Sequence, residues 1–394
     1  MLTTPSLFRA IVFALPWIAA PIRAVFRQRG TKSLDDYSEV PAEPIARVSV
    51  ILPARNEAAH IAECVASLRE TTWPDVEITV IDDHSTDGTG MLARKAAGHD
   101  KRIRVIDAPD LPAGWFGKQW ACHAGAQMAS GQLLLFTDAD TRHAPDLIAR
   151  MVRARAERDA SLISVAGTQI MNSFWEHAIQ PAVFAILMAR FGGTKQLEAA
   201  KRSTDVIANG QCLMFVRDAY EAIGGHESVR GTVAEDLMLA QRTHAHGFRV
   251  SLVLGTNQLS THMYDGLGAI VRGWMKNVYA GGRMAMWGGK FGRLLFPFAL
   301  VGAPLTMIAP FLGGSYVAVT GALGHSVSVT LALWSALGST GMLWFFSRAN
   351  TFARESTWRV LLVPLGMLVF AGICVGAVIR GQTVEWKGRT YRAA

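Results

Sequence analysis

The stretch LLLFTDADTRHAPD, residues 133–146, decides how the rest of the chain is interpreted. Four apolar residues lead through Thr137 into two carboxylates, Asp138 and Asp140, which only one alanine separates. Two carboxylates this close disfavour each other's ionisation unless a cation lies beside them. Oxygen ligands with open positions suit Mg²⁺ or Mn²⁺, which keep waters and bind substrate phosphates. The stretch therefore predicts a buried strand that ends in a metal-binding pair, although D-x-D taken alone is also common in surface loops.

Short aliphatic runs around this strand predict a mainly parallel sheet. The runs occupy residues 48–54, 76–83, 103–108 and 131–140, and helical patterns at 58–70, 89–97 and 119–129 separate them. Such alternation is typical of βαβ units with helices on both faces of the sheet. Ligands of these sheets bind at the carboxyl ends of the strands. We therefore expect the polar residues that follow the strands to converge on one crevice.

Two further groups of polar residues follow strands. Arg55-Asn56-Glu57 comes after the first run, and Asp82 and Asp83 end the second. The Ser, Asp and Gly residues at 85–88 are explained by a tight turn, but the two aspartates are not. A carboxylate at this position can accept hydrogen bonds from a base or from ribose hydroxyls. Because the chain has no G-x-G-x-x-G, we expect neither a nicotinamide nor a flavin.

A third acidic pair, Glu235 and Asp236, lies within residues 233–242 and precedes a helical stretch. Carboxylates are common at helix N-termini because they favour the helix dipole. The functional alternative is a general base, since a carboxylate can take a proton from an acceptor hydroxyl.

Composition separates the possible partners. The chain has 394 residues, a formal charge of +8 and a mean hydropathy of +0.22. A basic chain could bind nucleic acid, a membrane surface or an anionic ligand. Its Lys and Arg form no dense run with interleaved aromatics, so nucleic acid is not expected as a partner. The four scattered cysteines have no C-x-x-C spacing and indicate neither a zinc site nor a disulfide framework.

Apolar stretches of membrane-spanning length flank the predicted sheet domain. Residues 7–26 predict an uncleaved anchor, because the positive charges follow the apolar run and place its C-terminal side in the cytosol; an interfacial helix is the alternative. The other stretches are 294–323, 327–346 and 358–379, of which the first contains prolines and predicts either one tilted span or two re-entrant pieces. We expect a multi-pass protein of the cell membrane with a cytosolic catalytic domain. The predicted parts are an anchor (1–30), an α/β domain (46–293), transmembrane helices (294–380) and a basic tail (381–394).

Residues 48–274 resemble the family 2 glycosyltransferases with the GT-A fold. The resemblance rests on ILPARNE, DDHSTDGT, GKQWACHAGA, FTDAD and AED, which occur in the order and at the spacings usual in that family. It covers over half of the chain. It implies a Rossmann-like, mainly parallel sheet and an inverting hexosyltransferase that uses a nucleotide sugar.

The resemblance also implies roles for individual residues. Asp138 and Asp140 would hold Mg²⁺ or Mn²⁺ on the diphosphate. Asp236 would be the catalytic base, with Glu235 beside it. The residues that would bind the nucleotide sugar are Pro53, Arg55, Glu57, Asp82, Asp83, Lys118 and Asp138.

One departure from the family pattern concerns the acceptor. Processive members carry Q-x-x-R-W after the base, whereas this chain has IVRGW, in which Ile270 and Gly273 replace the Gln and the Arg. Arg272 and Trp274 remain as candidate acceptor-side residues. GWMKN, GGHESVRG and EWKGRTY resemble the branch that glycosylates membrane lipids, including carotenoid- and hopanoid-associated enzymes.

The predicted function is the transfer of one sugar, from UDP-glucose or another UDP-hexose, to a membrane lipid such as an isoprenoid or carotenoid. Alternatives left open are a polyprenyl-phosphate sugar transferase, a cell-envelope polysaccharide synthase and a non-catalytic membrane scaffold. Residues 174–191 predict either an interfacial helix beside the acceptor or an ordinary buried helix.

Overall fold

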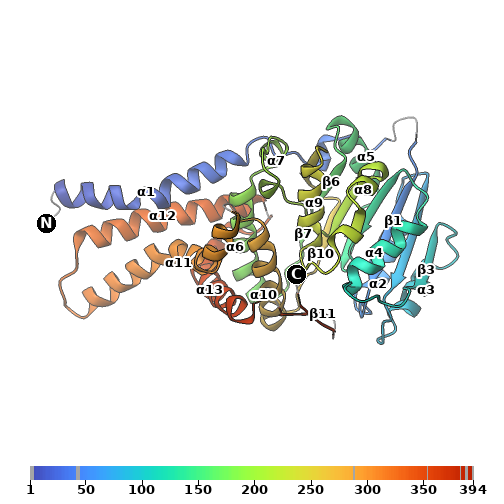
Figure 1. The fold of residues 1–394 in the computed structure, drawn as a ribbon. Coiled ribbons are helices and arrows are strands. Elements are labelled where there is room, and N and C mark those ends of the chain that lie inside the picture. Colours follow the sequence, from blue (N-terminus) through green and yellow to red (C-terminus); the bar gives the residue numbers. More distant parts are fainter. Residues whose placement is uncertain are drawn as a thin grey trace.

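The computed structural model describes residues 4–40, 45–286, 289–352, 354–381, 383–386 and 389–392. The molecule is elongated, with an α/β domain at one end and long helices at the other (Figure 1).

The α/β domain is built on a seven-stranded sheet with the order β3-β2-β1-β4-β8-β6-β9. The strands β3, β2, β1 and β4 are parallel, β8 runs antiparallel to both of its neighbours, and β9 is parallel to β6. The predicted mainly parallel sheet is thus confirmed. The bounds are β1 Val48–Ala54, β2 Val76–Asp82, β3 Ile103–Asp107, β4 Leu133–Thr137, β6 Leu162–Ala166, β8 Cys212–Val216 and β9 Val250–Leu254.

Helices cover both faces of this sheet because successive side chains of a strand point to opposite faces. Val50 packs with residues of α2, α3 and α5 in one core, and its neighbour Ile51 packs with residues of α4, α8 and α9 in another. The bounds are α2 Ile61–Arg69, α3 Thr89–Ala97, α4 Gly117–Met128, α5 Leu147–Glu157, α8 Arg217–Ala222 and α9 Glu235–Ala245. The strand order reverses between β1 and β4, and ligands of such sheets bind at the point of reversal.

A second, three-stranded sheet follows the D-x-D at the end of β4. Its strands are β5 Thr141–His143, β10 Leu259–Thr261 and β7 Thr168–Gln169, in the order β5-β10-β7. Because β5 follows the D-x-D directly, the sheet brings the residues after β10 beside that pair. Shorter elements connect the parts: η1 Leu34–Asp36, α7 Thr194–Glu198, η2 Ser203–Asp205, η3 Gly225–Val229 and η4 Thr357–Leu362.

Three helices, α6 Phe174–Phe191, α10 Leu267–Met284 and α13 Val363–Arg380, lie between the domain and the long helices (Figure 1). We call them the junction layer. They share one apolar core, in which Ile179, Trp274 and Phe370 are buried. Helix α6 begins at a capping box formed by Ser173 and Glu176, and half of its residues are buried. This burial favours the buried helix over the interfacial one for residues 174–191.

The long helices are α1 Thr4–Arg27, α11 Gly289–Ala322 and α12 Val329–Phe352, which lie side by side (Figure 1). Among the described residues, four helical segments are long and apolar enough to cross a membrane: 5–27, 289–322, 329–351 and 357–380. Helix α11 runs without a break for 34 residues despite three internal prolines. Of the two alternatives for residues 294–323, the single helix is therefore observed. After α13 the chain forms a hairpin of β11 Thr383–Trp386 and β12 Arg389–Arg392 that returns to the α/β domain.

Candidate active site

The loops after β1 and β2 are hydrogen-bonded to each other at the carboxyl end of the sheet. Asn56 and His84 have positive φ angles of 50° and 53°, a conformation that residues other than glycine rarely adopt. The Asn56 side-chain carbonyl accepts from the Thr86 amide at 2.9 Å, and the Asn56 amide donates to Ser85 Oγ at 3.0 Å. Backbone strain of this kind persists only where the surroundings enforce it. Here the enforced loops bring Arg55 beside the end of β2.

The two aspartates after β2 have different surroundings. The Asp83 side chain is only 2% exposed, and its Oδ2 lies 3.7 Å from Arg55 Nη1 and 2.7 Å from Arg389 Nη1. Its other oxygen, Oδ1, is buried and has no hydrogen-bond partner in the described structure. Asp82 instead supports the turn, since its Oδ1 accepts from the Ser85 amide at 3.0 Å. Of this predicted pair, Asp83 lines the central cavity described below.

The D-x-D pair lies at the end of β4, as predicted. Lys118 Nζ is 2.7 Å from Asp138 Oδ1 and 2.8 Å from Glu235 Oε1, so one lysine connects two of the predicted acidic groups. Burial, with the nearby charges of Asp138 and Glu57, raises the pKa of Asp140 to about 7. Its Oδ1 is buried without a hydrogen-bond partner among the described residues. A buried, unpartnered carboxylate oxygen beside a second carboxylate fits a divalent cation.

Glu235 and Asp236, which begin α9, also differ from each other. Burial alone would raise the pKa of Glu235, but the Lys118 ammonium outweighs it and the pKa is lowered. Burial and the charge of Glu235 raise the pKa of Asp236 to about 6, and the charge of Lys118 opposes them only in part. Its two oxygens accept from the amides of Gly210 at 2.9 Å and Leu237 at 2.8 Å. Asp236 is thus held in place and is a stronger base than an ordinary aspartate.

A cavity of about 1050 Å³ joins these groups to the junction layer. Its polar end is lined by residues that follow β1 and β2, such as Arg55 and Asp83, and by the carboxylates of the D-x-D and of α9. Its other end is lined by apolar side chains of α6, α10, α11 and α13, among them Phe184, Leu300 and Phe370. Arg272 and Trp274 line it too, so every predicted site residue except Asp82 lies on the cavity wall. The Trp274 Nε1 atom is buried, with no hydrogen-bond partner in the described structure.

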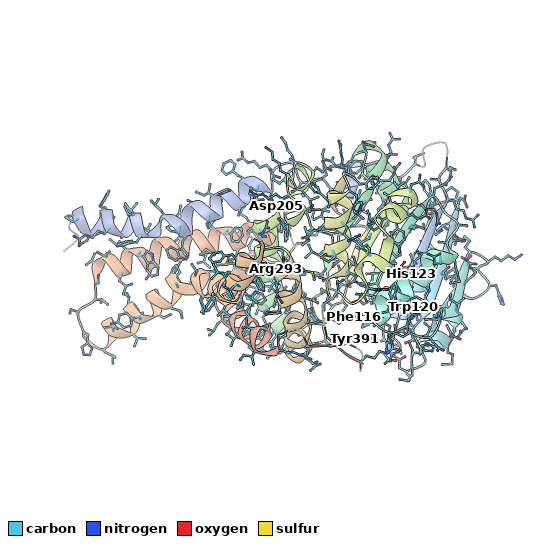
Figure 2. All side chains as sticks on the ribbon, in the orientation of Figure 1. Phe116, Trp120, His123, Asp205, Arg293 and Tyr391 are labelled. Atoms are coloured by element: carbon cyan, nitrogen blue, oxygen red, sulfur yellow. The ribbon has the colours of Figure 1, made fainter. Side chains whose placement is uncertain are left out.

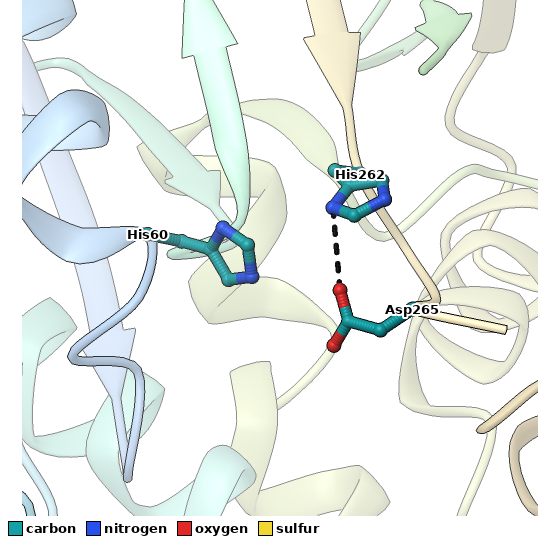
Figure 3. Close-up of side chains that lie close together, drawn as sticks. All are labelled: His60, His262 and Asp265. Carbon is teal, nitrogen blue, oxygen red and sulfur yellow. Dashed lines mark ion pairs between the residues drawn. The ribbon is translucent and has the colours of Figure 1, made fainter. Parts of the chain in front are cut away.

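Other cavity-lining groups were not predicted from the sequence. Lys276 on α10 lines the cavity, and burial lowers its pKa although Glu235 opposes this. His60, His262 and Asp265 place their ligand atoms within 4.8 Å of one another and could hold a metal ion (Figure 3). The His262 amide donates to the Asp140 carbonyl at 3.4 Å, so this group adjoins the D-x-D. The sequence spacing does not reveal this group, because about 200 residues separate the two histidines.

Known proteins share the sequence pattern and the fold. The sequence profile described as Glycosyl transferase family 2 matches residues 49–224. The 4,4'-diaponeurosporenoate glycosyltransferase of Staphylococcus haemolyticus is 26% identical over 262 residues, which are 65% of this chain and 67% of that protein. The beta-monoglucosyldiacylglycerol synthase of a Nostoc species is 26% identical over 202 residues, 50% of this chain and 41% of that protein.

Among solved structures, the mannosyltransferase PcManGT from Pyrobaculum calidifontis, in complex with GDP-Man and Mn²⁺, superposes with a TM-score of 0.53. The superposition covers 95% of this chain and 98% of that one at 18% identity, and shows a common fold. Residues 49–224 are therefore a family 2 glycosyltransferase domain with the GT-A fold, and the chain is a glycosyltransferase.

Proposed function

We propose that this enzyme transfers one hexose from a UDP-sugar to a lipid acceptor that lies in the membrane. The observation that carries the proposal is the cavity, which joins the carboxylates at the strand ends to an apolar wall. Part of that wall belongs to α11 and α13, which are apolar enough to cross a membrane. The names of two relatives, a diaponeurosporenoate glycosyltransferase and a diacylglycerol glycolipid synthase, also refer to lipids.

The donor occupies the polar end in this proposal. Asp83 offers its unpartnered Oδ1 to the nucleoside, and Pro53, Arg55 and Glu57 line the same end. Asp138 and Asp140 would hold Mg²⁺ or Mn²⁺, which would supply positive charge against the leaving diphosphate. The mannosyltransferase with the same fold was solved with GDP-Man and Mn²⁺. Lys118 adds a fixed charge at Asp138.

Transfer is a single displacement with inversion. The acceptor hydroxyl oxygen forms a bond to the anomeric carbon as the bond from that carbon to the diphosphate oxygen breaks. Asp236 takes the hydroxyl proton, and the electron pair of the broken bond leaves with the nucleotide. The two backbone hydrogen bonds on Asp236 fix its direction, while Glu235 remains ionised against Lys118.

The catalytic domain faces the cytosol in this proposal, where nucleotide sugars are made. Arg23, Arg27 and Arg29 lie at the domain end of α1, and basic residues beside a span favour the cytosolic side.

A polyprenyl phosphate is the second candidate acceptor. Arg272 and Lys276 line the cavity near the junction layer and supply positive charge that a phosphate group would need. The chemistry of the product separates the candidates. A glycosyl phosphate, the product on a polyprenyl phosphate, releases its sugar in mild acid. A sugar ester, the product on a carboxylate, releases its sugar in mild alkali. A glycoside of a hydroxyl resists both mild treatments.

The test uses the full-length chain in native membranes with Mn²⁺ and radiolabelled UDP-glucose or other UDP-hexoses. Label should extract into organic solvent as one discrete glycolipid, and the Asp236→Asn variant should form it about 10²-fold more slowly. Label recovered as a water-soluble product or a high-molecular-weight polymer would overturn the proposal.

A further inference from the structure

The C-terminal hairpin contacts the proposed donor pocket at two separate points. Arg389 Nη1 donates to Asp83 Oδ2 at 2.7 Å, across 306 residues of sequence. Tyr391 lies beside Phe116, with ring centroids 4.2 Å apart and planes 31° apart (Figure 2). The Gly117 amide donates to the Tyr391 hydroxyl oxygen at 3.3 Å. Side chains of one short strand thus bridge the end of β2 and the start of α4.

The first contact determines how the Asp83 carboxylate is presented. Arg55 and Arg389 both approach Oδ2, and Arg389 is the nearer. A carboxylate that is only 2% exposed is costly to bury without such partners. Both cations lie on Oδ2, while Oδ1 is buried with no hydrogen-bond partner in the described structure, and Asp83 lines the cavity. Arg389 therefore fixes the direction of the carboxylate proposed to accept from the nucleoside.

The second contact reaches the start of α4. The Gly117 amide is one of the donors that the first turn of a helix leaves without an intrahelical acceptor. Tyr391 supplies that acceptor and packs on the residue before it. The next residue along α4 is Lys118, which pairs with Asp138 and Glu235. Tyr391 therefore holds the helix start that carries the lysine of the diphosphate side.

We infer that Arg389 and Tyr391 are positioning residues of the donor site, so that the hairpin after the last helix completes the pocket for a nucleoside diphosphate. This inference rests on the proposed donor pocket. Arg389 orients the carboxylate for the nucleoside and Tyr391 orients the lysine near the diphosphate. A hairpin that merely covered the domain would not need side-chain contacts to both the end of β2 and the start of α4.

The test measures donor binding and kinetics of the full chain in detergent or nanodiscs. Calorimetry with UDP and with GDP, each with Mn²⁺, first establishes whether the wild-type chain binds a nucleoside diphosphate. For Arg389→Ala we expect nucleotide affinity to fall and donor KM to rise by about 10-fold, as expected for loss of a charge-assisted hydrogen bond of ~1.4 kcal/mol. The acceptor KM should change less than twofold. Arg389→Lys, which keeps the charge, should recover part of the loss, and Tyr391→Phe should raise donor KM about threefold.

Arg153→Ala is the matched control, because it removes an exposed arginine–carboxylate pair on α5, with Glu157, outside the cavity. It should change neither KM. Unchanged donor KM in Arg389→Ala, tighter nucleotide binding, or equal rises in both KM values would overturn the inference. If the wild-type chain bound neither nucleotide, the proposed function itself would fail, which is a distinguishable result. Unfolding temperatures of all variants separate a loss of folding from a loss of positioning.

Discussion

The two ends of the central cavity are built in different ways. At the donor end, charged groups from adjacent strand ends are fixed by short hydrogen bonds and ion pairs, as at Asp83 and Asp138. At the proposed acceptor end, apolar side chains of α6, α10, α11 and α13 line the wall. Directional contacts select one chemical group, whereas apolar contacts mainly select size and shape. The difference predicts a strict requirement for the donor and a broader tolerance for the acceptor.

The largest effect is expected at the donor end, from Asp140→Ala. The substitution removes a proposed metal ligand and one of the two carboxylates of the D-x-D. A loss of ~4 kcal/mol of transition-state stabilisation lowers kcat/KM by about 10³-fold. The measurement is transfer from the UDP-sugar with Mn²⁺, with chelator-treated wild-type enzyme as the reference. Full activity in excess chelator would contradict the metal assignment.

Asp236→Asn should produce the next largest effect, at the point where the two ends meet. We expect kcat to fall by about 10²-fold with donor affinity nearly unchanged, because a general base is lost but no donor contact is. A collapse of donor affinity in calorimetry would make Asp236 a binding residue instead. If the acceptor were a carboxylate, which arrives ionised, the fall in kcat would be much smaller.

The pH dependence of the wild-type enzyme offers a second measure of the same residue. Asp236 must be ionised to take a proton, and burial raises its pKa to about 6. The rate should therefore be constant above about pH 7 and should fall as the pH drops below about 6. A profile that stayed flat down to pH 5 would show that no group of this pKa acts as the base.

Gly210→Ala tests how firmly the base is positioned. A Cβ at Gly210 would lie 2.9 Å from Asp236 Oδ2, so the carboxylate must move. Because small displacements of a catalytic group are costly, we expect kcat to fall about 10-fold. Gly302→Ala is the control, since nothing lies within 4 Å of a Cβ there. Equal kinetics of the two variants would contradict the proposed role of Gly210.

The smallest effect is expected at the acceptor end, from Leu300→Trp, which narrows the apolar wall. Overpacking by ~1 kcal/mol should raise the acceptor KM about 5-fold and leave the donor KM unchanged. Both are measured with a purified acceptor lipid. A larger effect than that of Asp140→Ala would invert the comparison between the two ends.

The sequence predicts the donor end better than the rest because its signals are local. The strand 48–54 and the helix 89–97 have the predicted bounds, since continuous aliphatic runs and a turn mark them. The antiparallel β8 was not predicted, because a five-residue apolar run does not distinguish a strand from a buried helix. No local pattern encodes contacts between residues more than 100 positions apart, such as Lys118–Glu235 and Arg389–Asp83. The position of Lys276 in the cavity depends on the fold in the same way.

The contact between Arg389 and Asp83 also constrains how the chain threads a bilayer. Two groups that touch lie on the same side of any membrane, so the segment from residue 289 to residue 381 must cross an even number of times. Helices α11 and α12 lead away from the domain and back to it (Figure 1). Helix α13 packs so closely on α6 that a Cβ at Gly366 would lie 1.8 Å from the Ala178 carbonyl oxygen. If α11 and α12 each cross the bilayer, that even number leaves no full crossing for α13, which instead rests against α6.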